Sequence, residues 1–226
     1  MKAAADPHAA GRLATFGPAA GRARRAVIGL HGRGAGADDM GGLVTSLGFP
    51  DIAVYAPEAA GLSWWPTSFL APADAMEPFV LSALAAVDRA VDAATEDGYD
   101  RAQLTLIGFS QGGCLALEYT ARRGAVASAV FGLSAGLIGT ADAAGPPDDA
   151  LYGHTPKAFD YEADLSGLPM RVSVHERDPH IPLARSRESV RVLERLDAEA
   201  TLHVARGAGH GLTEADVAAL RAALNG

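Results

Sequence analysis

Short apolar runs alternate with longer amphipathic segments along most of this chain. A short apolar run bounded by turn residues predicts a buried strand, whereas apolar residues at helical spacing predict an amphipathic helix. Strands that alternate with helices form βαβ units, and these build a mostly parallel sheet with helices on both faces. We therefore expect an α/β fold whose ligand site lies beyond the carboxyl ends of the strands.

The clearest helix is expected from Asp74 to Gly98. Asp74 and Glu77 have the form of a capping box at its start, and Gly98 is a suitable stop. Thr213 is the expected cap of the last helix, and the segment 136–167, rich in Gly, Pro and Asp, predicts a long connection. The expected strands are 25–30, 52–56, 103–107, 125–133, 170–174 and 200–204, and the other expected helices are 38–47, 111–123, 183–196 and 214–224.

The length of 226 residues suits one well-filled domain, and neither a repeat nor a long linker divides it. We expect residues 1–226 to form a single domain whose N-terminal segment, 1–24, is partly irregular. Hydrophobic residues make up 49% of the chain and charged residues 20%, which is the balance of an ordinary soluble globular protein.

Charge and cysteine content narrow the class of protein further. The formal net charge of −8, without a basic run, argues against nucleic acid or an anionic membrane surface as the main partner. Cys114 is the only cysteine, so we expect neither a disulfide framework nor a cysteine-based metal site. Met1 to His8 lack the apolar stretch of a secretory signal, and no stretch is long enough to span a bilayer. A cytoplasmic protein is expected.

The run Gly108-Phe109-Ser110-Gln111-Gly112 matches the G-x-S-x-G nucleophile elbow. In such an elbow the turn from strand to helix is so tight that side chains two residues either side of the serine would collide, which explains both glycines. The alternative is a plain glycine-rich turn. The expected strand before the motif and the amphipathic helix after it favour the elbow, with Ser110 as the nucleophile.

A serine hydroxyl needs a base within hydrogen-bond reach to attack a carbonyl group. His210 lies in a glycine-lined loop that follows an expected strand and precedes the last helix, where it can reach over a neighbouring site. The alternative is a surface loop histidine. His8 is expected in a frayed terminus and His154 in a polar connection. Packing or loop support is expected for His31, His175 and His203.

The base in turn needs an acid that fixes its tautomer and stabilises the imidazolium. Asp178 follows the expected strand 170–174 and stands between Ser110 and His210 in the chain. This gives the Ser–Asp–His order that accompanies a nucleophile elbow. Glu176 is the runner-up, and a surface salt bridge is the alternative role for either carboxylate.

An oxyanion hole requires N–H donors beside the nucleophile. We expect one donor to be the backbone N–H of Gln111, directly after Ser110. The other is expected from the turn His31-Gly32-Arg33-Gly34, where the N–H of Arg33 is favoured. The Arg33 side chain either stabilises this loop or meets a polar or anionic group of the substrate.

Five motifs in consistent order carry a family resemblance: His31-Gly32-Arg33-Gly34, Trp64-Trp65-Pro66, Ser68-Phe69-Leu70-Ala71-Pro72, Gly108-Phe109-Ser110-Gln111-Gly112-Gly113 and Asp178-Pro179-His180-Ile181-Pro182, followed by Gly209-His210. They resemble the phospholipase/carboxylesterase family, which also contains the acyl-protein thioesterases. The resemblance implies an α/β-hydrolase fold with a minimal lid or none, a Ser110–Asp178–His210 triad, Arg33 and Gln111 amides as oxyanion hole, and a homodimer.

The chain departs from the acyl-protein thioesterases of this family at two places. Acyl-protein thioesterases tend to have an apolar residue where this chain has Arg33, and the stretch from Trp65 to Pro72 is closer to the bacterial carboxylesterase branch. The aromatic residues Trp64, Trp65 and Phe69 either form a substrate pocket or pack the loop onto the sheet.

Together these features predict a serine hydrolase that cleaves small-molecule carboxylic esters of short to medium acyl length through an acyl-enzyme, without a metal or organic cofactor. Thioesters, lysophospholipids, lactones and peptides are alternative substrates of the same chemistry. Dienelactone hydrolases carry cysteine at the elbow, which Ser110 argues against. A binding protein without activity has no reason to keep all three triad residues. A nucleotide-binding sheet is disfavoured because the glycines that follow residue 30 lack the required spacing.

Overall fold

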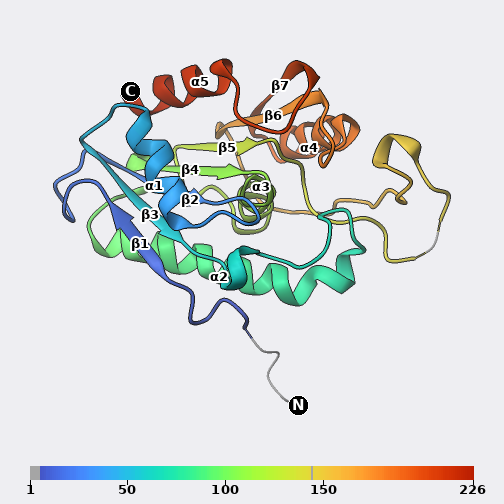
Figure 1. The fold of residues 1–226 in the computed structure, drawn as a ribbon, viewed down its shortest axis with the longest axis horizontal. Helices are drawn as coiled ribbons and strands as arrows, with labels where there is room; N and C mark the ends of the chain where they lie inside the picture. Colours follow the sequence, from blue (N-terminus) through green and yellow to red (C-terminus); the bar gives the residue numbers. More distant parts are fainter. Residues whose placement is uncertain (1–5, 144) are drawn as a thin grey trace.

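The computed structural model describes residues 6–143 and 145–226. They form a seven-stranded sheet with the strand order β1-β3-β2-β4-β5-β6-β7 (Figure 1). Only β1 is antiparallel to its neighbour, and the pairs from β3 to β7 are parallel. The strands are β1 (Leu13–Phe16), β2 (Arg25–Leu30), β3 (Ile52–Pro57), β4 (Leu104–Phe109), β5 (Ala129–Leu133), β6 (Pro169–Arg177) and β7 (Glu199–Ala208).

Helices cover both faces of the sheet. Side chains of α1 and α5 pack against one face, and those of α2, α3 and α4 against the other. The helices are α1 (Ala37–Ser46), α2 (Ala73–Glu96), α3 (Gln111–Arg123), α4 (Leu183–Arg195) and α5 (Glu214–Asn225). None of the helices in the described part of the chain combines the length and apolar character that a membrane crossing requires.

Alternation along the strands divides the core between these two faces. On β2, Val27 is buried towards α1 and α5, whereas Ile28 is buried towards α2, α3 and α4. On β4, Ile107 is likewise buried towards α1 and α5, and Leu106 towards α2, α3 and α4. Successive side chains of a strand point to opposite faces, and a parallel sheet is covered on both, so these strands are mostly apolar, with Arg25 and Thr105 as the exceptions.

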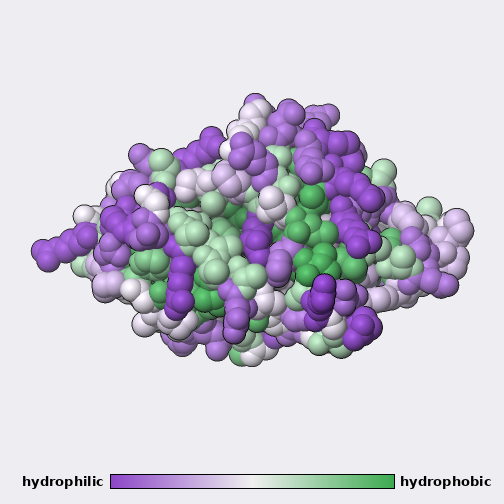
Figure 2. All heavy atoms as spheres, turned by 90° about the horizontal axis from the view of Figure 1, so that it is seen from above, coloured by the Kyte–Doolittle hydropathy of each residue, from purple (hydrophilic) through white to green (hydrophobic). Residues whose placement is uncertain are grey.

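On the side that carries α5, apolar residues also reach the surface. Figure 2 shows hydrophobic residues gathered in two areas of the face seen from above, separated and surrounded by hydrophilic residues. A hollow of about 500 Å³ lies between α5 and the strands β5, β6 and β7.

The expected alternation of strands and helices is confirmed, with one strand missed. β1 lies in the segment 1–24, which was expected to be partly irregular and whose residues 1–5 are outside the described part of the chain. It is a short edge strand that pairs Leu13 with Pro57, far along the chain, so its own four residues carry little signal. β6 and β7 extend to Arg177 and Ala208, further than expected.

The helix caps were predicted with mixed success. Thr213 caps α5, accepting the N–H of Asp216, as expected. The predicted capping box of α2 is wrong, because α2 begins at Ala73 and its N-cap residue, Pro72, makes no side-chain cap. Glu77 instead forms an ion pair with Arg122, at 2.7 Å between Oε1 and Nη1.

His8 is not part of a frayed end. Its side chain is buried, with 1% of the residue exposed, and both ring nitrogens have hydrogen-bond partners. A local sequence pattern does not contain these partners, because they lie more than fifty residues further along the chain.

The connection from β5 to β6 contains, in its described part, only the short 3₁₀ helix η3 (Asp149–Leu151). Glu118 of α3, a fully buried carboxylate, binds this connection near both of its ends: it accepts the Ile138 N–H at 3.2 Å and the Tyr161 hydroxyl at 2.8 Å. Arg122 donates to the same carboxylate at 2.7 Å. Arg185 of α4, also fully buried, donates to the carbonyls of residues 137 and 139.

We expect Glu118→Ala to lower the free energy of unfolding by about 3 kcal/mol, because one partner of a buried charged network is removed. Urea denaturation measures this. Glu96→Ala, which changes an exposed glutamate of α2, is the control and should stay within about 0.5 kcal/mol of wild type. Equal losses in the two variants would contradict a structural role for Glu118.

Candidate active site

Ser110 occupies a strained turn between β4 and α3. Its φ of 54° and ψ of −118° lie in a region that non-glycine residues rarely adopt. A Cβ atom on Gly108 would lie 2.1 Å from the Gly112 carbonyl oxygen, and one on Gly112 would lie 2.1 Å from the Leu30 carbonyl oxygen. Both positions therefore exclude any side chain, as the elbow motif requires.

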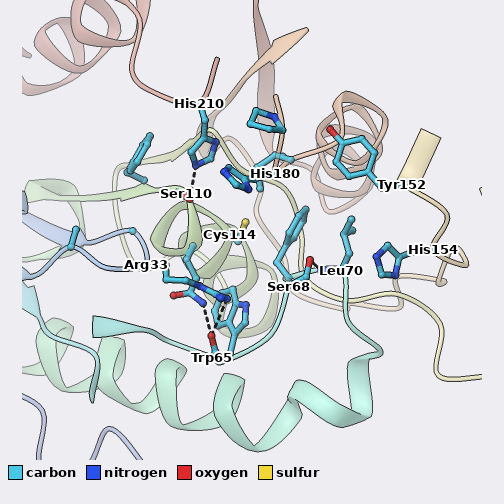
Figure 3. Close-up of a pocket in the computed structure, with 17 residues that line it drawn as sticks. Arg33, Trp65, Ser68, Leu70, Ser110, Cys114, Tyr152, His154, His180 and His210 are labelled. Carbon is cyan, nitrogen blue, oxygen red and sulfur yellow. Dashed lines mark hydrogen bonds between the residues drawn. The ribbon is translucent and has the colours of Figure 1, made fainter. Parts of the chain in front are cut away.

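His210 lies in the loop between β7 and α5, where its ring meets the serine. Nε2 of His210 is 2.7 Å from Oγ of Ser110 (Figure 3). Nδ1 of the same ring is 2.8 Å from Oδ2 of Asp178. The three side chains, which come from three different strand ends, thus form one continuous hydrogen-bond chain.

Asp178 follows β6, and its carboxylate is fully buried. Burial disfavours the charged form, but hydrogen bonds from His210 and from the N–H groups of His180 and Ile181 outweigh it, and the pKa of Asp178 lies below its ordinary value. An ionised Asp178 keeps the proton of His210 on Nδ1, which leaves Nε2 to accept the Ser110 hydroxyl proton. Glu176, the runner-up, is exposed and accepts the Gly207 N–H at 2.8 Å.

The turn after β2 lies directly beside the elbow. A Cβ atom on Gly32 would be 3.4 Å from Cβ of Ser110. Within residues 6–143 and 145–226, the backbone N–H groups of Arg33 and Gln111 have no hydrogen-bond acceptor. Gln111 is also the first residue of α3, where N–H groups and the helix dipole favour negative charge. Both N–H groups are therefore suited to bind an oxyanion.

The side chains of these same two residues bind one loop. The Arg33 guanidinium donates to the carbonyl oxygens of Trp65, at 3.1 Å, and of Pro66 and Thr67. Oε1 of Gln111 accepts the Trp64 N–H at 2.9 Å, and its Nε2 donates to the Trp65 carbonyl at 2.8 Å. Of the two roles expected for the Arg33 side chain, these contacts correspond to loop stabilisation.

His31 supports the turn after β2, as expected. Nε2 of His31 accepts the Ala59 N–H at 3.0 Å, and Nδ1 lies 2.8 Å from the Gly32 carbonyl oxygen. The ring is fully buried, and this burial lowers its pKa. A neutral ring is required here, because Nε2 must accept from an N–H group.

A cleft of about 570 Å³ opens above Ser110. Trp65 (Figure 3) lines it, and so does Phe69, which corresponds to the pocket alternative for these two aromatic residues. Trp64 does not line it, which corrects the expectation for that residue. Trp64 is fully buried, stacks on His31 and donates from Nε1 to the His31 carbonyl at 2.9 Å, because the loop turns its side chain into the core.

Three further residues of the cleft were missed in the sequence. Tyr152 and His154 reach it from the long connection, and the Tyr152 hydroxyl donates to the backbone carbonyl of Asp178. No periodic pattern identifies such residues in an irregular segment. His180 lines the cleft edge-on to His210, with ring centroids 4.8 Å apart. Its position two residues after Asp178 could have identified it in the sequence.

Cys114 borders the cleft one turn into α3 but is no alternative nucleophile. Burial raises the pKa of its thiol to about 12, so it stays protonated near neutral pH. Among the described residues, no group of three or more His, Cys, Asp or Glu side chains is placed to hold a metal ion.

Comparison with known proteins identifies the family of this chain. The sequence model of the family described as Phospholipase/Carboxylesterase matches residues 17–147. A phospholipase/carboxylesterase from Dyadobacter fermentans is 32% identical, with a TM-score of 0.82, and the match covers 96% of this chain and 97% of that one. No curated protein matched the chain.

Two more distant structures share the fold. The carboxylesterase from Bacillus cereus is 17% identical with a TM-score of 0.70, and the match covers 96% of this chain and 94% of that one. The carboxylesterase from Mesorhizobium loti is 19% identical with a TM-score of 0.69, covering 96% and 95%. From its matched sequence and its mostly parallel sheet, the chain belongs to the phospholipase/carboxylesterase family of hydrolases and has the α/β-hydrolase fold.

Proposed function

We propose that this protein hydrolyses small-molecule carboxylic esters through an acyl-enzyme formed on Ser110. The observation that carries the proposal is the hydrogen-bond chain from Ser110 through His210 to Asp178, at 2.7 and 2.8 Å. Family membership supports the same activity. So does Ser110, because dienelactone hydrolases carry cysteine at this position of the elbow.

In the first half of the reaction, Nε2 of His210 takes the Ser110 proton while Oγ attacks the ester carbonyl carbon. The carbonyl oxygen becomes an oxyanion, which accepts hydrogen bonds from the N–H groups of Arg33 and Gln111. When the tetrahedral intermediate collapses, the bond to the alcohol oxygen breaks and His210 gives its proton to the leaving alcohol. Water then attacks the acyl-enzyme by the same route and releases the acid.

Short to medium acyl chains suit the shape and lining of the cleft. Trp65 and Phe69 offer apolar contact close to Ser110. Tyr152 and His154 of the long connection also line the cleft, and their polar rings are poor partners for a long alkyl chain. An acyl group of modest length therefore stays on the apolar part of the cleft.

Ser110→Ala should reduce ester hydrolysis by roughly 10⁴-fold or more, because the acyl-enzyme cannot form. Initial rates with p-nitrophenyl acetate and butyrate measure this. Ser46→Ala, on the exposed surface of α1, is the matched control and should retain the wild-type rate. Hydrolysis that persists in Ser110→Ala would refute the assignment of the nucleophile.

Asp178→Asn should lower kcat by roughly 10⁴-fold, since an amide no longer holds the His210 tautomer that accepts the serine proton. Glu176→Gln is the informative control, because it changes the neighbouring carboxylate of the same strand end in the same way. We expect it to keep near wild-type kcat. A large loss in Glu176→Gln with little loss in Asp178→Asn would exchange the two assignments.

A series of p-nitrophenyl esters from acetate to palmitate should give its highest kcat/KM at short to medium acyl length, because Tyr152 and His154 interrupt the apolar lining of the cleft. The matching thioesters, measured in parallel, test the alternative leaving group. A maximum at palmitate would contradict the proposed acyl preference, and a thioester rate far above the ester rate would contradict the proposed bond type.

A further inference from the structure

The N-terminal residues 6–11, here called the N-terminal strap, lie against α2 before the chain enters β1 (Figure 1). The His8 N–H donates to Oγ of Ser82 at 2.9 Å, and that hydroxyl also donates to the Asp6 carboxylate. Arg89 donates to the His8 carbonyl at 2.7 Å. These contacts fix the backbone of His8 on the surface of α2.

The ring of His8 bridges the two ends of a short loop. Nδ1 accepts the Ala60 N–H at 3.1 Å, and Nε2 lies 3.0 Å from the Trp64 carbonyl oxygen. An N–H group can only donate, and a carbonyl can only accept, so the ring is neutral with its proton on Nε2. The loop 60–64 is thus bound by one side chain at both ends.

Trp64 connects this loop to both expected oxyanion donors. Its indole packs edge-on to His8 and stacks on His31, with centroid distances of 5.4 and 4.9 Å. Its Nε1 donates to the carbonyl of His31, two residues before Arg33, and its N–H donates to the side chain of Gln111. A shift of Trp64 therefore acts both on the turn that carries Arg33 and on Gln111.

We propose that His8 is a positioning residue, which through Trp64 sets the placement of the Arg33 and Gln111 N–H groups around the oxyanion. The inference rests on the proposed function, in which these groups stabilise the intermediate. His8 does not line the cleft, so its effect passes through other residues. It also lies outside the segment 17–147 that the family model matches.

His8→Ala should lower kcat by roughly 10- to 100-fold while KM changes by less than about threefold, because the donors are misplaced and the cleft lining is kept. Arg89→Ala is the matched control. It loosens the same strap by removing a bond to the His8 backbone but leaves the ring in place, so kcat should stay within about threefold of wild type.

Two conservative variants separate positioning from general stability. His8→Asn keeps an acceptor near the Ala60 N–H, and His8→Gln keeps a donor near the Trp64 carbonyl. Each should recover part of the kcat lost in His8→Ala, and both keep the test valid if His8→Ala folds poorly. Equal kcat losses in His8→Ala and Arg89→Ala, or no recovery in either amide variant, would overturn the proposal.

Hydrogen exchange measured by mass spectrometry tests the same link without activity. The amides of the loop 59–65 and of the turn 31–35 should exchange faster in His8→Ala than in Arg89→Ala or wild type. If wild type hydrolyses no ester, the proposed function fails, while this comparison still decides whether His8 holds the loop and turn. Unchanged exchange in His8→Ala would refute the role of His8 directly.

Discussion

The close approach of α3 to the end of β2 is the constraint on which the rest of the site depends. Gly112 lies so near the Leu30 carbonyl that no side chain fits between them. This contact lets α3 begin directly above the sheet, and it holds Ser110 in a backbone conformation that serine rarely adopts. The surrounding packing stabilises this strain, so the serine hydroxyl stands where loops from the neighbouring strand ends converge.

Around this turn, backbone and side chains of the same residues have separate tasks. The N–H groups of Arg33 and Gln111 are the proposed oxyanion donors, while their side chains bind the loop that carries Trp64 and Trp65. His31 binds the start of that loop. Donors held on both sides in this way need little rearrangement when an oxyanion forms, which is the condition for strong electrostatic stabilisation.

Much of this could be predicted from the sequence because its signals are local. The alternation of strands and helices, the elbow and the Thr213 cap each depend on neighbours within a few residues. What failed depends on distant partners: Glu77 forms an ion pair with Arg122 and does not cap its own helix, and Trp64 faces inward because of how its loop packs. No pattern within an irregular segment marks which of its residues, such as Tyr152, reach the cleft.

The long connection between β5 and β6 is bound near its start by Glu118 and Arg185. Its tip, with Tyr152 and His154, forms part of the cleft rim. In the proposed function, this tip contributes to substrate choice but supplies no residue of the triad. Such a division lets evolution, or loop grafting in the laboratory, replace the tip and change the accepted acids or alcohols while the hydrolytic centre is inherited intact.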